Sequence, residues 1–501
     1  MSDGRTLAER LADFAAESSF ETLPAEVVDS VKMRVLDTLG IAAAAAPLDT
    51  SRAARRWAAE QGGAARASAI GVPQQLPPAL AAFVNGVLAH SLDYDDTHLP
   101  SVLHPSAAVV PAALAAAESQ DGDGRTLIHA IAVGLEVCVR LGMAGYDEEA
   151  GNSIFFEHGQ HATSICGAMG AAAAVAVIGA RASGSGSEGV RDAVLHALGV
   201  AASMAAGIIE ANRTGGTVKR IHCGWAAHAG VSAAELVRHG LTGPPTVLEG
   251  RFGFFEAWLH GQADLAAVTE GLGESWSVPG IFFKPYPANH FTHAAVDAAA
   301  ALRLAGVTPD QVERLVLGVP APNLRTIGEP IEVKRRPETG YMAQFSGPYA
   351  VAVGLYGGGG LGSALDDYTD RLAHDPDRRA LMDKVEVVAD DECTAIFPRQ
   401  FPAVLTARLH DGREIVEKVL TTRGGPARPL SLAELGTKFR DNASRVLPAA
   451  RVEAVAADCA ALDQRSDLTA VLAPLTGVDA GIWDNSRADG PTTAAEEVEG
   501  S

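Results

Sequence analysis

Alanine-rich segments of helical length dominate the first half of the chain and constrain its fold more than any other feature. The run from Ala162 to Ala182 consists mostly of Ala, Gly, Val and Ile. Alanine has the highest intrinsic helix propensity of the natural residues. The sequence is 47% hydrophobic but only 5% aromatic, so small aliphatic side chains must build much of its interior. These features predict a body of closely packed helices.

Periodic apolar residues predict several further helices in the same half of the chain. One should begin near Pro24, carry Val27 and Val31 on one face, and end at Gly40, a residue common at helix C-termini. The remaining helices are expected at residues 51–61, 78–91, 107–120, 124–143, 190–209 and 226–239. We therefore expect residues 1–277 to form a helical domain.

The pattern changes after residue 277. Alternating apolar residues predict strands at Val312–Pro320 and Met382–Ala389. Phe401–Leu420 reads as a hairpin, because its two alternating runs are joined through Asp411-Gly412, a favoured turn pair. Helices at residues 292–304 and 349–356 alternate with these strands, and the glycine run 357–362 reads as a turn after the second of them.

The order of these patterns predicts the domain organisation. Residues 278–427 should form a smaller α+β domain, and residues 428–475 should return to the helical domain, which would make the α+β domain an insertion. Residues 476–501 are polar and acidic, and we expect them to be a disordered tail. The fold class expected is mainly α.

Charge and cysteine usage exclude several classes of protein. A net charge of -21 disfavours nucleic acid and acidic membrane surfaces as partners. The five cysteines are scattered and form no C-x-x-C pair, which disfavours a disulfide framework and a structural zinc site. No secretory leader is visible, and the apolar stretch 167–180 is shorter than the roughly twenty residues that span a bilayer. We expect a cytoplasmic protein.

The stretch from His90 to Ser106 concentrates the polar chemistry of an otherwise aliphatic region. If its first half is helical, Asp93 and Thr97 lie one turn apart on the same face. Pro100 would break that helix and leave His104 on an irregular segment, so that a carboxylate, a hydroxyl and an imidazole face one cavity. The alternative is an N-cap cluster followed by a solvated acidic turn.

A metal site in this stretch is a further alternative. The oxygen and nitrogen ligands could come from Asp93, Asp95, Asp96, His98 and His104. Their spacing matches no closed metal site, and nearby lysines would compete with a cation. We therefore expect no metal.

A second histidine, His161, stands just before the alanine-rich helix that begins at Ala162. Thr163 or Ser164 could cap that helix. The positive end of the helix would then disfavour a charge on His161 and leave a neutral ring able to exchange protons. The alternative is a structural capping histidine.

Two cationic segments complete the candidate site. Lys219, Arg220 and His222 lie in a glycine-containing loop between apolar helices, where they could hold carboxylates. Lys284 stands between Phe-Phe and Pro-Tyr286-Pro at the expected domain junction, a place where ligands often bind. The alternatives are a solvated basic loop and a linker whose lysine reaches solvent.

Taken together, these motifs resemble the MmgE/PrpD family, over about Leu7 to Leu462. The resemblance is carried by His90-Ser-Leu-Asp-Tyr-Asp-Asp-Thr97 with His104-Pro-Ser106, His161-Ala-Thr-Ser-Ile-Cys-Gly167, Lys219-Arg-Ile-His222 with Gly224-Trp-Ala-Ala227, Leu248-Glu-Gly250 with Gly253-Phe254, and Lys284-Pro-Tyr-Pro287 with His293-Ala-Ala-Val-Asp297. It implies a large helical domain with a smaller inserted α+β lid, usually a homodimer, and no cofactor or metal.

The resemblance also implies site residues. The residues thought to line the pocket in the decarboxylase branch of the family match Asp93, Thr97, His104, His161, Lys219 and Lys284. The enteric type of dehydratase in the family typically has Asn in place of Asp95, and an Asp-Asn pair where this chain has Ala107 and Ala108. The substrate therefore stays open.

The expected activity is that of a cofactor-independent lyase acting on a small di- or tricarboxylic acid such as 2-methylcitrate or cis-aconitate. Catalysis would rest on the six pocket residues, while Arg220, His222 and Tyr286 would help to bind the substrate. An isomerase or epimerase of a small carboxylic acid is the first alternative. The second is a non-catalytic helical protein that binds carboxylates.

Overall fold

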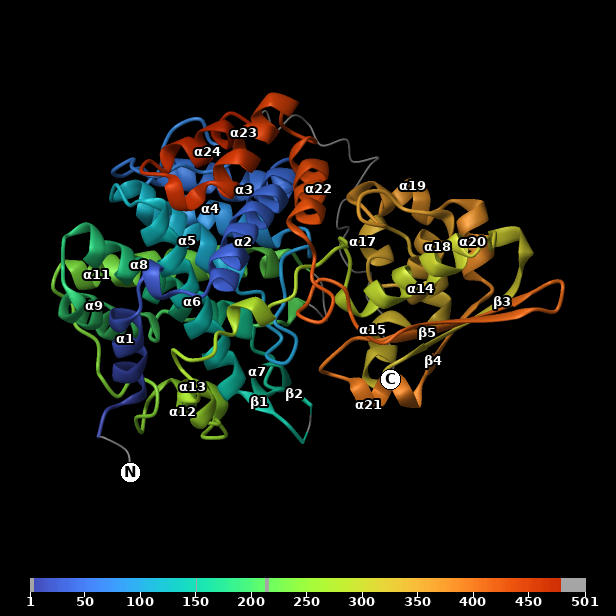
Figure 1. Ribbon diagram of the computed structural model, residues 1–501, viewed down its shortest axis with the longest axis horizontal. Helices are drawn as coiled ribbons and strands as arrows, with labels where there is room; N and C mark the ends of the chain where they lie inside the picture. Colours follow the sequence, from blue (N-terminus) through green and yellow to red (C-terminus); the bar gives the residue numbers. More distant parts are fainter. Residues whose placement is uncertain (1–3, 150, 212–215, 479–501) are drawn as a thin grey trace. The chain divides into compact units, whose positions relative to one another are not determined.

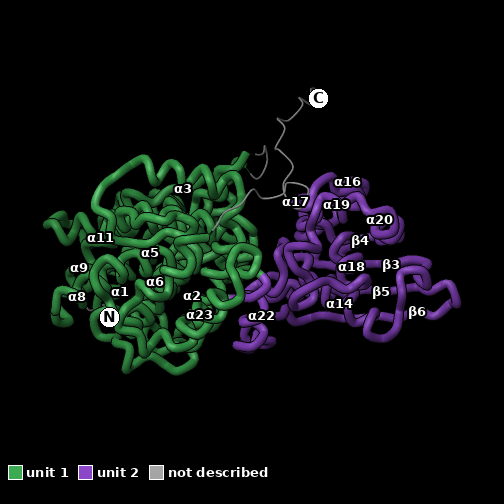
Figure 2. Tube along the Cα trace, turned by 90° about the horizontal axis from the view of Figure 1, so that it is seen from above, with its two compact units in different colours: residues 1–281, 442–481 green, residues 282–441, 482–501 purple. Residues whose placement is uncertain are grey.

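The computed structural model describes residues 4–149, 151–211 and 216–478. The chain folds into two compact units, shown in separate colours in Figure 2. One contains the chain up to Ile281 together with the stretch that begins at Asn442, and the other contains Phe282–Asp441. From residue 479 onward, the predicted disordered tail lies outside the described residues.

The first unit is built almost entirely from helices, which confirms the prediction of a mainly helical fold. They are labelled in Figure 1 where there is room. The helices and 3-10 turns are α1 (Leu7–Glu17), η1 (Phe20–Thr22), α2 (Ala25–Ala45), α3 (Asp49–Gln61), α4 (Pro78–His90), α5 (Ser106–Ser119), α6 (Gly124–Ala144), α7 (Ile154–Glu157), α8 (Ala162–Ala182), α9 (Ser187–Ala201), η2 (Val218–Ile221), α11 (His222–Arg238), α12 (Phe254–Leu259), α13 (Ala266–Thr269), η3 (Val278–Gly280), α23 (Ala449–Ala460), η8 (Leu462–Gln464) and α24 (Thr469–Thr476).

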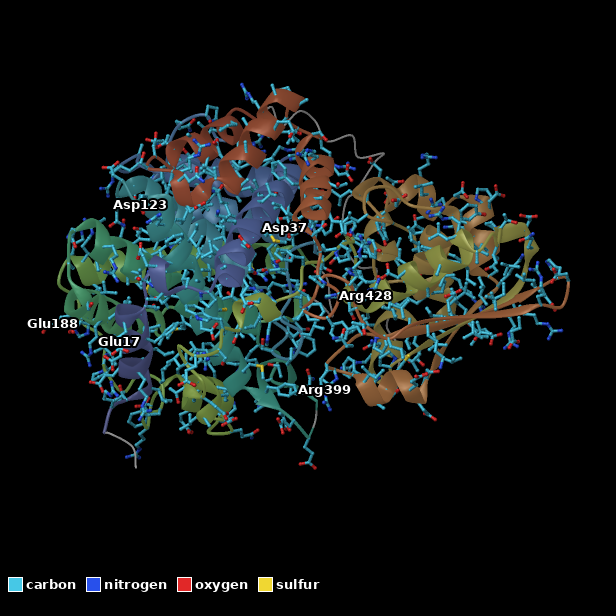
Figure 3. All side chains as sticks on the ribbon, viewed as in Figure 1. Glu17, Asp37, Asp123, Glu188, Arg399 and Arg428 are labelled. Atoms are coloured by element: carbon cyan, nitrogen blue, oxygen red, sulfur yellow. The ribbon has the colours of Figure 1, made fainter. Side chains whose placement is uncertain are left out.

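Helix α8 is the centre of this unit and packs against α5, α6, α9 and α11 (Figure 1). Its small residues permit close approach: a Cβ atom added to Gly170 would lie 2.4 Å from the carbonyl oxygen of Gly134 in α6. Both α6 and α8 are 21 residues long and apolar enough to cross a membrane, but 94% of each apolar window is buried inside the protein. This degree of burial is typical of the core helices of a globular domain, and α6 and α8 are core helices here. Asp123, labelled in Figure 3, caps α6 by accepting from the backbone N–H of Thr126.

Two close helix contacts shape the region that carries the candidate site. A Cβ atom added to Gly224 in α11 would lie 2.4 Å from the carbonyl oxygen of Phe83 in α4, and one added to Gly86 would meet the Cα of Gly224 at 2.8 Å. These glycines therefore allow the middle of α4 to pack closely against the first turn of α11. His90 ends α4, and His222 begins α11.

Three details of this unit differ from the prediction. The helix expected to end at Gly40 continues to Ala45, because the alanines that follow Gly40 favour a helix and are buried. The helix expected over residues 190–209 ends at Ala201. The unit is also not wholly helical, since Tyr146–Asp147 (β1) pairs antiparallel with Asn152–Ser153 (β2) beside Gly151, whose φ is 62°.

The second unit contains a four-stranded sheet in the order β4-β3-β5-β6, whose strands the alternating apolar runs predicted. The strands are β3 (Val312–Val319), β4 (Val385–Ala389), β5 (Ala403–Leu409) and β6 (Glu414–Val419). β3 pairs parallel with β4 and antiparallel with β5, which forms the predicted hairpin with β6. Strand β4 begins three residues later than expected, because Pro376–Met382 is a short helix instead.

The second unit also contains helices and 3-10 turns. They are η4 (His290–Thr292), α14 (His293–Leu304), η5 (Pro309–Gln311), η6 (Ala321–Asn323), α15 (Leu324–Ile327), α16 (Ile331–Arg335), α17 (Gly340–Ala343), α18 (Gly347–Tyr356), η7 (Leu365–Asp367), α19 (Asp370–Ala373), α20 (Pro376–Met382), α21 (Asp391–Ile396) and α22 (Leu432–Ala443), the last of which crosses the boundary into the first unit. α14 packs on α18 and on strands β5 and β6, and apolar residues of these elements form one buried core. The glycine run after α18 begins with a left-handed residue, Gly357 at φ 89°, as expected of a turn.

Candidate functional site

The polar segment that follows α4 is irregular rather than helical. α4 ends at His90, and Asp93 has a left-handed backbone with φ 52°. The prediction that Asp93 and Thr97 share a helical face is therefore wrong. Asp is one of the few residues that tolerate the left-handed region, and strained backbone of this kind is often found at functional sites. The side chains of this segment take their directions from tertiary contacts instead of from a helical period.

One of these contacts is a buried ion pair that anchors the segment. Arg34 Nη1 donates to Asp96 Oδ2 at 2.6 Å, and Arg34 Nη2 donates to the carbonyl oxygens of Val278 at 2.9 Å and Ile281 at 2.8 Å. Asp96 also accepts from the Ser106 backbone N–H at 3.2 Å and from the Ser106 hydroxyl. Burial raises the pKa of Asp96, and the Arg34 charge opposes that rise. This network ties the segment to α2 and to the start of α5.

His104 is held in one tautomer by a backbone contact. Its Nδ1 lies 2.7 Å from the carbonyl oxygen of Asp96 and 3.4 Å from Thr97 Oγ1. A carbonyl oxygen can only accept, so Nδ1 carries the proton and, in the neutral ring, Nε2 presents a lone pair. The backbone N–H of His104 donates to Thr163 Oγ1 at 3.2 Å. The structure thus brings the predicted pair Thr97 and His104 together.

A second imidazole, His90, is paired with a carboxylate. His90 Nδ1 lies 2.6 Å from Asp95 Oδ2, and both side chains are buried. Asp95 Oδ1 is 3.9 Å from His104 Nδ1. The His90 ring centroid lies 5.4 Å from that of His104 and 5.7 Å from that of His161. His90 therefore lies in the middle of a group of histidines.

The third and fourth imidazoles, His161 and His222, form a hydrogen-bonded pair. Their Nδ1 atoms are 2.9 Å apart, so one Nδ1 must donate and the other accept. Burial is the main cause that lowers the pKa of His161 well below its usual value and that of His222 to about 4. Both rings are thus neutral near pH 7. One of them then presents a lone pair at Nε2 and the other an N–H.

The hydroxyls expected to cap α8 have other roles, so that prediction is wrong. His161 occupies the N-cap position of α8, and no side chain caps this helix. Thr163 accepts from the His104 backbone, and Ser164 Oγ donates to the His222 carbonyl oxygen at 3.1 Å. Tertiary contacts outweigh local capping here, because these hydroxyls are buried beside the irregular segment and α11.

The cationic loop contributes Lys219, whose Nζ lies 3.7 Å from Asp93 Oδ1. Both side chains are partly exposed, so the pair contributes little to stability and Lys219 can exchange partners. Arg220 Nη1 donates to Thr50 Oγ1 at 3.2 Å. The first four residues of the loop, Asn212–Gly215, lie outside the described residues.

The remaining predicted residues, Lys284 and Tyr286, belong to the second unit. The Lys284 side chain is buried. The Tyr286 hydroxyl donates to Asp297 and accepts from Arg423 Nη1, which lies 3.3 Å away. Burial raises the pKa of this hydroxyl, so Tyr286 stays protonated.

The structure changes which residues could hold a metal. In the proposed metal set, Asp96 is engaged by Arg34, and His98 bonds Ser101 Oγ at 2.7 Å. Among the described residues, one group of potential ligands is compact, with ligand atoms of His90, Asp95 and Cys223 all within 4.8 Å of one another. Burial raises the pKa of the Cys223 thiol well above its usual value, and a protonated thiol is a poor ligand.

Sequence reasoning gave no catalytic role to His90 or Arg34, and it weighed Asp95 only as a possible metal ligand and as a difference from the enteric dehydratases. His90 and Asp95 lie inside the polar stretch, so their residue types in an aliphatic region were the available signal. Arg34 lies within a helix 62 residues before its partner, Asp96, and no local pattern connects the two. What the site can do chemically follows from its contents: neutral imidazoles to move protons, and a partly exposed lysine to bind an anion.

Comparison with known proteins adds a family and named relatives. Residues 9–266 match the MmgE/PrpD N-terminal domain, and residues 286–462 match the MmgE/PrpD C-terminal domain. The chain is 29% identical to the cis-aconitate decarboxylase of Homo sapiens over 90% of each protein, and 27% identical to that of Aspergillus terreus over 92% of this chain and 94% of the relative. It is 30% identical to the 2-methylcitrate dehydratase of Cupriavidus necator over 48% of this chain and 50% of that protein.

Proposed function

We propose that this chain, which belongs to the MmgE/PrpD family, is a lyase that removes carbon dioxide or water from a small tricarboxylic acid without a cofactor. The observation that carries the proposal is the group of four imidazoles beside Lys219 in the first unit, of which His90, His161 and His222 are buried and His104 is partly exposed. Relatives with this family's sequence are lyases of two kinds, decarboxylases and dehydratases.

Decarboxylation of cis-aconitate is our first candidate. The decarboxylase relatives match about nine tenths of this chain, whereas the dehydratase of Cupriavidus necator matches about half. Dehydration of 2-methylcitrate is the second candidate, supported by that half-length match at 30% identity. We rank decarboxylation before dehydration because the decarboxylase relatives match a larger share of this chain.

The chemistry of both reactions suits the same groups. When carbon dioxide leaves, the electron pair of the broken C–C bond spreads toward a remaining carboxylate, and a proton must then reach carbon. In a dehydration, a base removes a proton beside a carboxylate and an acid protonates the departing hydroxyl. Both routes develop negative charge that a cation stabilises, and both need a proton carrier.

We assign roles to the first unit's residues on this basis. Lys219, with Arg220, binds substrate carboxylates as a cation whose present partner, Asp93, is weakly held. His104 offers Nε2 for proton transfer, because its Nδ1–H is held by the Asp96 carbonyl. His161 serves as a neutral base, paired with His222.

The second unit enters the proposal as the inserted α+β lid of the family. From the family resemblance, we also propose Lys284 and Tyr286 of its Lys-Pro-Tyr-Pro segment as site residues. A homodimer and a cytoplasmic location also remain proposals. Light scattering of the purified protein tests the first, since a dimer would have twice the 51.7 kDa mass of the chain.

The test of the activity follows three substrates by proton NMR: cis-aconitate, citrate and 2-methylcitrate. Loss of carbon dioxide identifies a decarboxylase and loss of water a dehydratase. Deuterium from the solvent that enters recovered substrate, without either loss, would indicate an isomerase instead. Binding of carboxylates with no product would indicate a protein that has lost the chemistry.

Variants test the site assignment in the same assay. Lys219→Ala and His104→Ala should each reduce turnover at least about a hundredfold. Lys418→Ala is the matched control, because it removes an exposed lysine whose Nζ lies 2.6 Å from Glu392, in the second unit. Strong wild-type turnover that persists unchanged in both site variants would contradict the assignment.

A further inference from the structure

The pair formed by His90 and Asp95 has no role in the reaction as described so far. It joins the last residue of α4 to the irregular segment, through a distance of 2.6 Å between His90 Nδ1 and Asp95 Oδ2. A carboxylate in contact with one ring nitrogen fixes the tautomer of an imidazole and stabilises its charged form. The Nδ1–H of His90 therefore points at Asp95, and its Nε2 is the nitrogen left for proton exchange.

The second ring nitrogen of His90, Nε2, differs from most buried polar atoms in its hydrogen bonding. His90 Nε2 is buried and has no hydrogen-bond partner among the described residues. Buried polar atoms are nearly always paired, and the exceptions are often found where a ligand, a water or chemistry belongs. The ring lies 5.4 Å from His104 and 5.7 Å from His161, measured between centroids, so its surroundings are the proposed site itself.

The charged and titratable groups around His90 come from several elements. Asp95 and His104 lie on the segment after α4, His161 at the start of α8, and His222 with Cys223 at the start of α11. Lys219 on η2 acts on His161 and His222, since its charge is a cause of their lowered pKa. When one of these imidazoles carries a positive charge, it disfavours protonation of its neighbours. His90 is accordingly one cause of the lowered pKa of both His161 and His222. Protonation of all four imidazoles together is therefore disfavoured. The Asp95 carboxylate is in hydrogen-bond contact with one of these rings, that of His90.

We propose that His90 and Asp95 form an additional acid–base dyad of this site, in which the Asp95 carboxylate holds a proton on the His90 ring. A proton taken up at Nε2 gives an imidazolium whose charge Asp95 balances, and its release returns the neutral Nδ1–H ring. Asp95 is then a positioning residue, and His90 a proton store for the neighbouring histidines. The catalytic part of this inference rests on the lyase function proposed above.

Asp95→Asn is the sharpest variant. The amide oxygen can still accept from His90 Nδ1, so the ring keeps its orientation while the negative charge is lost. We expect kcat to fall at least about tenfold with KM changed less than about twofold. The limb of the pH–rate profile that reports the dyad should move to lower pH, because the imidazolium loses its counter-charge. His90→Gln should remove that limb.

The matched control is Glu118→Gln, near the end of α5. Glu118 is also a buried carboxylate, and it accepts from the Ser68 backbone N–H and hydroxyl, each at 2.6 Å. It lies twelve residues along α5 from Ser106, or about 18 Å. This variant should lose stability without any change in the pH–rate profile. An Asp95→Asn protein that loses stability but keeps the wild-type kcat and pH profile would overturn the proposal.

A second measurement does not depend on turnover. Nitrogen-15 NMR of selectively labelled histidines, with His90→Gln to assign the signal, should show an Nδ1-protonated His90 ring that titrates at higher pH in the wild type than in Asp95→Asn. An unchanged titration would overturn the dyad even if the lyase function holds. A titration that shifts as expected in a protein without turnover would leave the dyad and refute the lyase function.

Elemental analysis tests the competing use of the same atoms. His90, Asp95 and Cys223 could instead hold a transition metal ion. The dyad predicts no stoichiometric metal in the purified wild type and no effect of Cys223→Ser on the His90 titration. One equivalent of zinc or another transition metal that disappears in Cys223→Ser would overturn the dyad.

Discussion

Asp95 and Asp96 are consecutive, chemically identical and buried, yet their side chains contact two different parts of the first unit. Asp96 faces Arg34 and Ser106, and its contacts tie the segment to α2 and α5. Asp95 faces His90 and, at 3.9 Å, His104. The first arrangement fixes the chain, whereas the second places a negative charge among groups that can move protons.

The difference between them is the chemistry of the partner. A guanidinium keeps its proton throughout the physiological pH range, so the Arg34–Asp96 pair is a permanent structural contact. An imidazole gains and loses a proton near neutrality, so a carboxylate beside it can control that exchange. Neighbouring residues in an irregular segment can thus serve stability and chemistry separately.

Breaking the structural member of this comparison should have the largest effect. Arg34→Ala leaves Asp96 buried without its cation and frees the carbonyl oxygens of Val278 and Ile281. Removing one partner of a buried ion pair typically costs about 3–5 kcal/mol. We expect a loss of that size in the free energy of unfolding from urea titration. A loss below about 1 kcal/mol would show that the pair does not anchor the segment.

The next effect separates two histidines of the same segment. His104→Gln should lower kcat about a hundredfold, equivalent to about 2.7 kcal/mol, because its Nε2 is assigned to proton transfer. His98→Gln is the matched change, since His98 bonds Ser101 and burial lowers its pKa to about 4. It should affect thermal stability but not kcat. Equal losses of kcat in the two variants would contradict the assignment of proton transfer to His104 and not to His98.

A smaller effect concerns a neutral histidine outside the cluster. Burial lowers the pKa of His129 in α6 to about 4, whereas an unfolded histidine titrates near 6.5. Between these values the unfolded chain binds more protons, so the contribution of His129 to stability is complete above pH 6.5 and is lost as the pH falls toward 4.

We therefore expect the acid-induced loss of stability between pH 7 and pH 5 to be about 2 kcal/mol smaller in His129→Gln than in the wild type. Urea titrations at the two pH values measure it, and the exposed His239→Gln is the control. Kinetic pH profiles of the variant should match the wild type. If the acid loss is the same in both proteins, His129 is not the buried neutral group described above.

Local patterns predicted much of the secondary structure. The helix at Ala162–Ala182 was predicted with its observed bounds, and the hairpin at Asp411-Gly412 was confirmed. These features depend on propensities and turn preferences that act over a few residues. The wrong predictions concern features that tertiary contacts decide. The helix expected to end at Gly40 continues, Thr163 does not cap α8, and Asp93 is not helical.

The sequence by itself determined where the polar breaks fall between apolar helices, and hence which residues were available for chemistry. Only the tertiary structure decided how those residues pair: Asp96 with Arg34, Asp95 with His90, and His161 with His222. The physical reason is that side chains on a helix or strand follow a fixed period, whereas those on an irregular segment follow none. Arg34 lies 62 residues from Asp96, and His161 lies 61 residues from His222, so tertiary packing must bring these partners together. The glycine contacts between α4 and α11 place His90 and His222 in the same region.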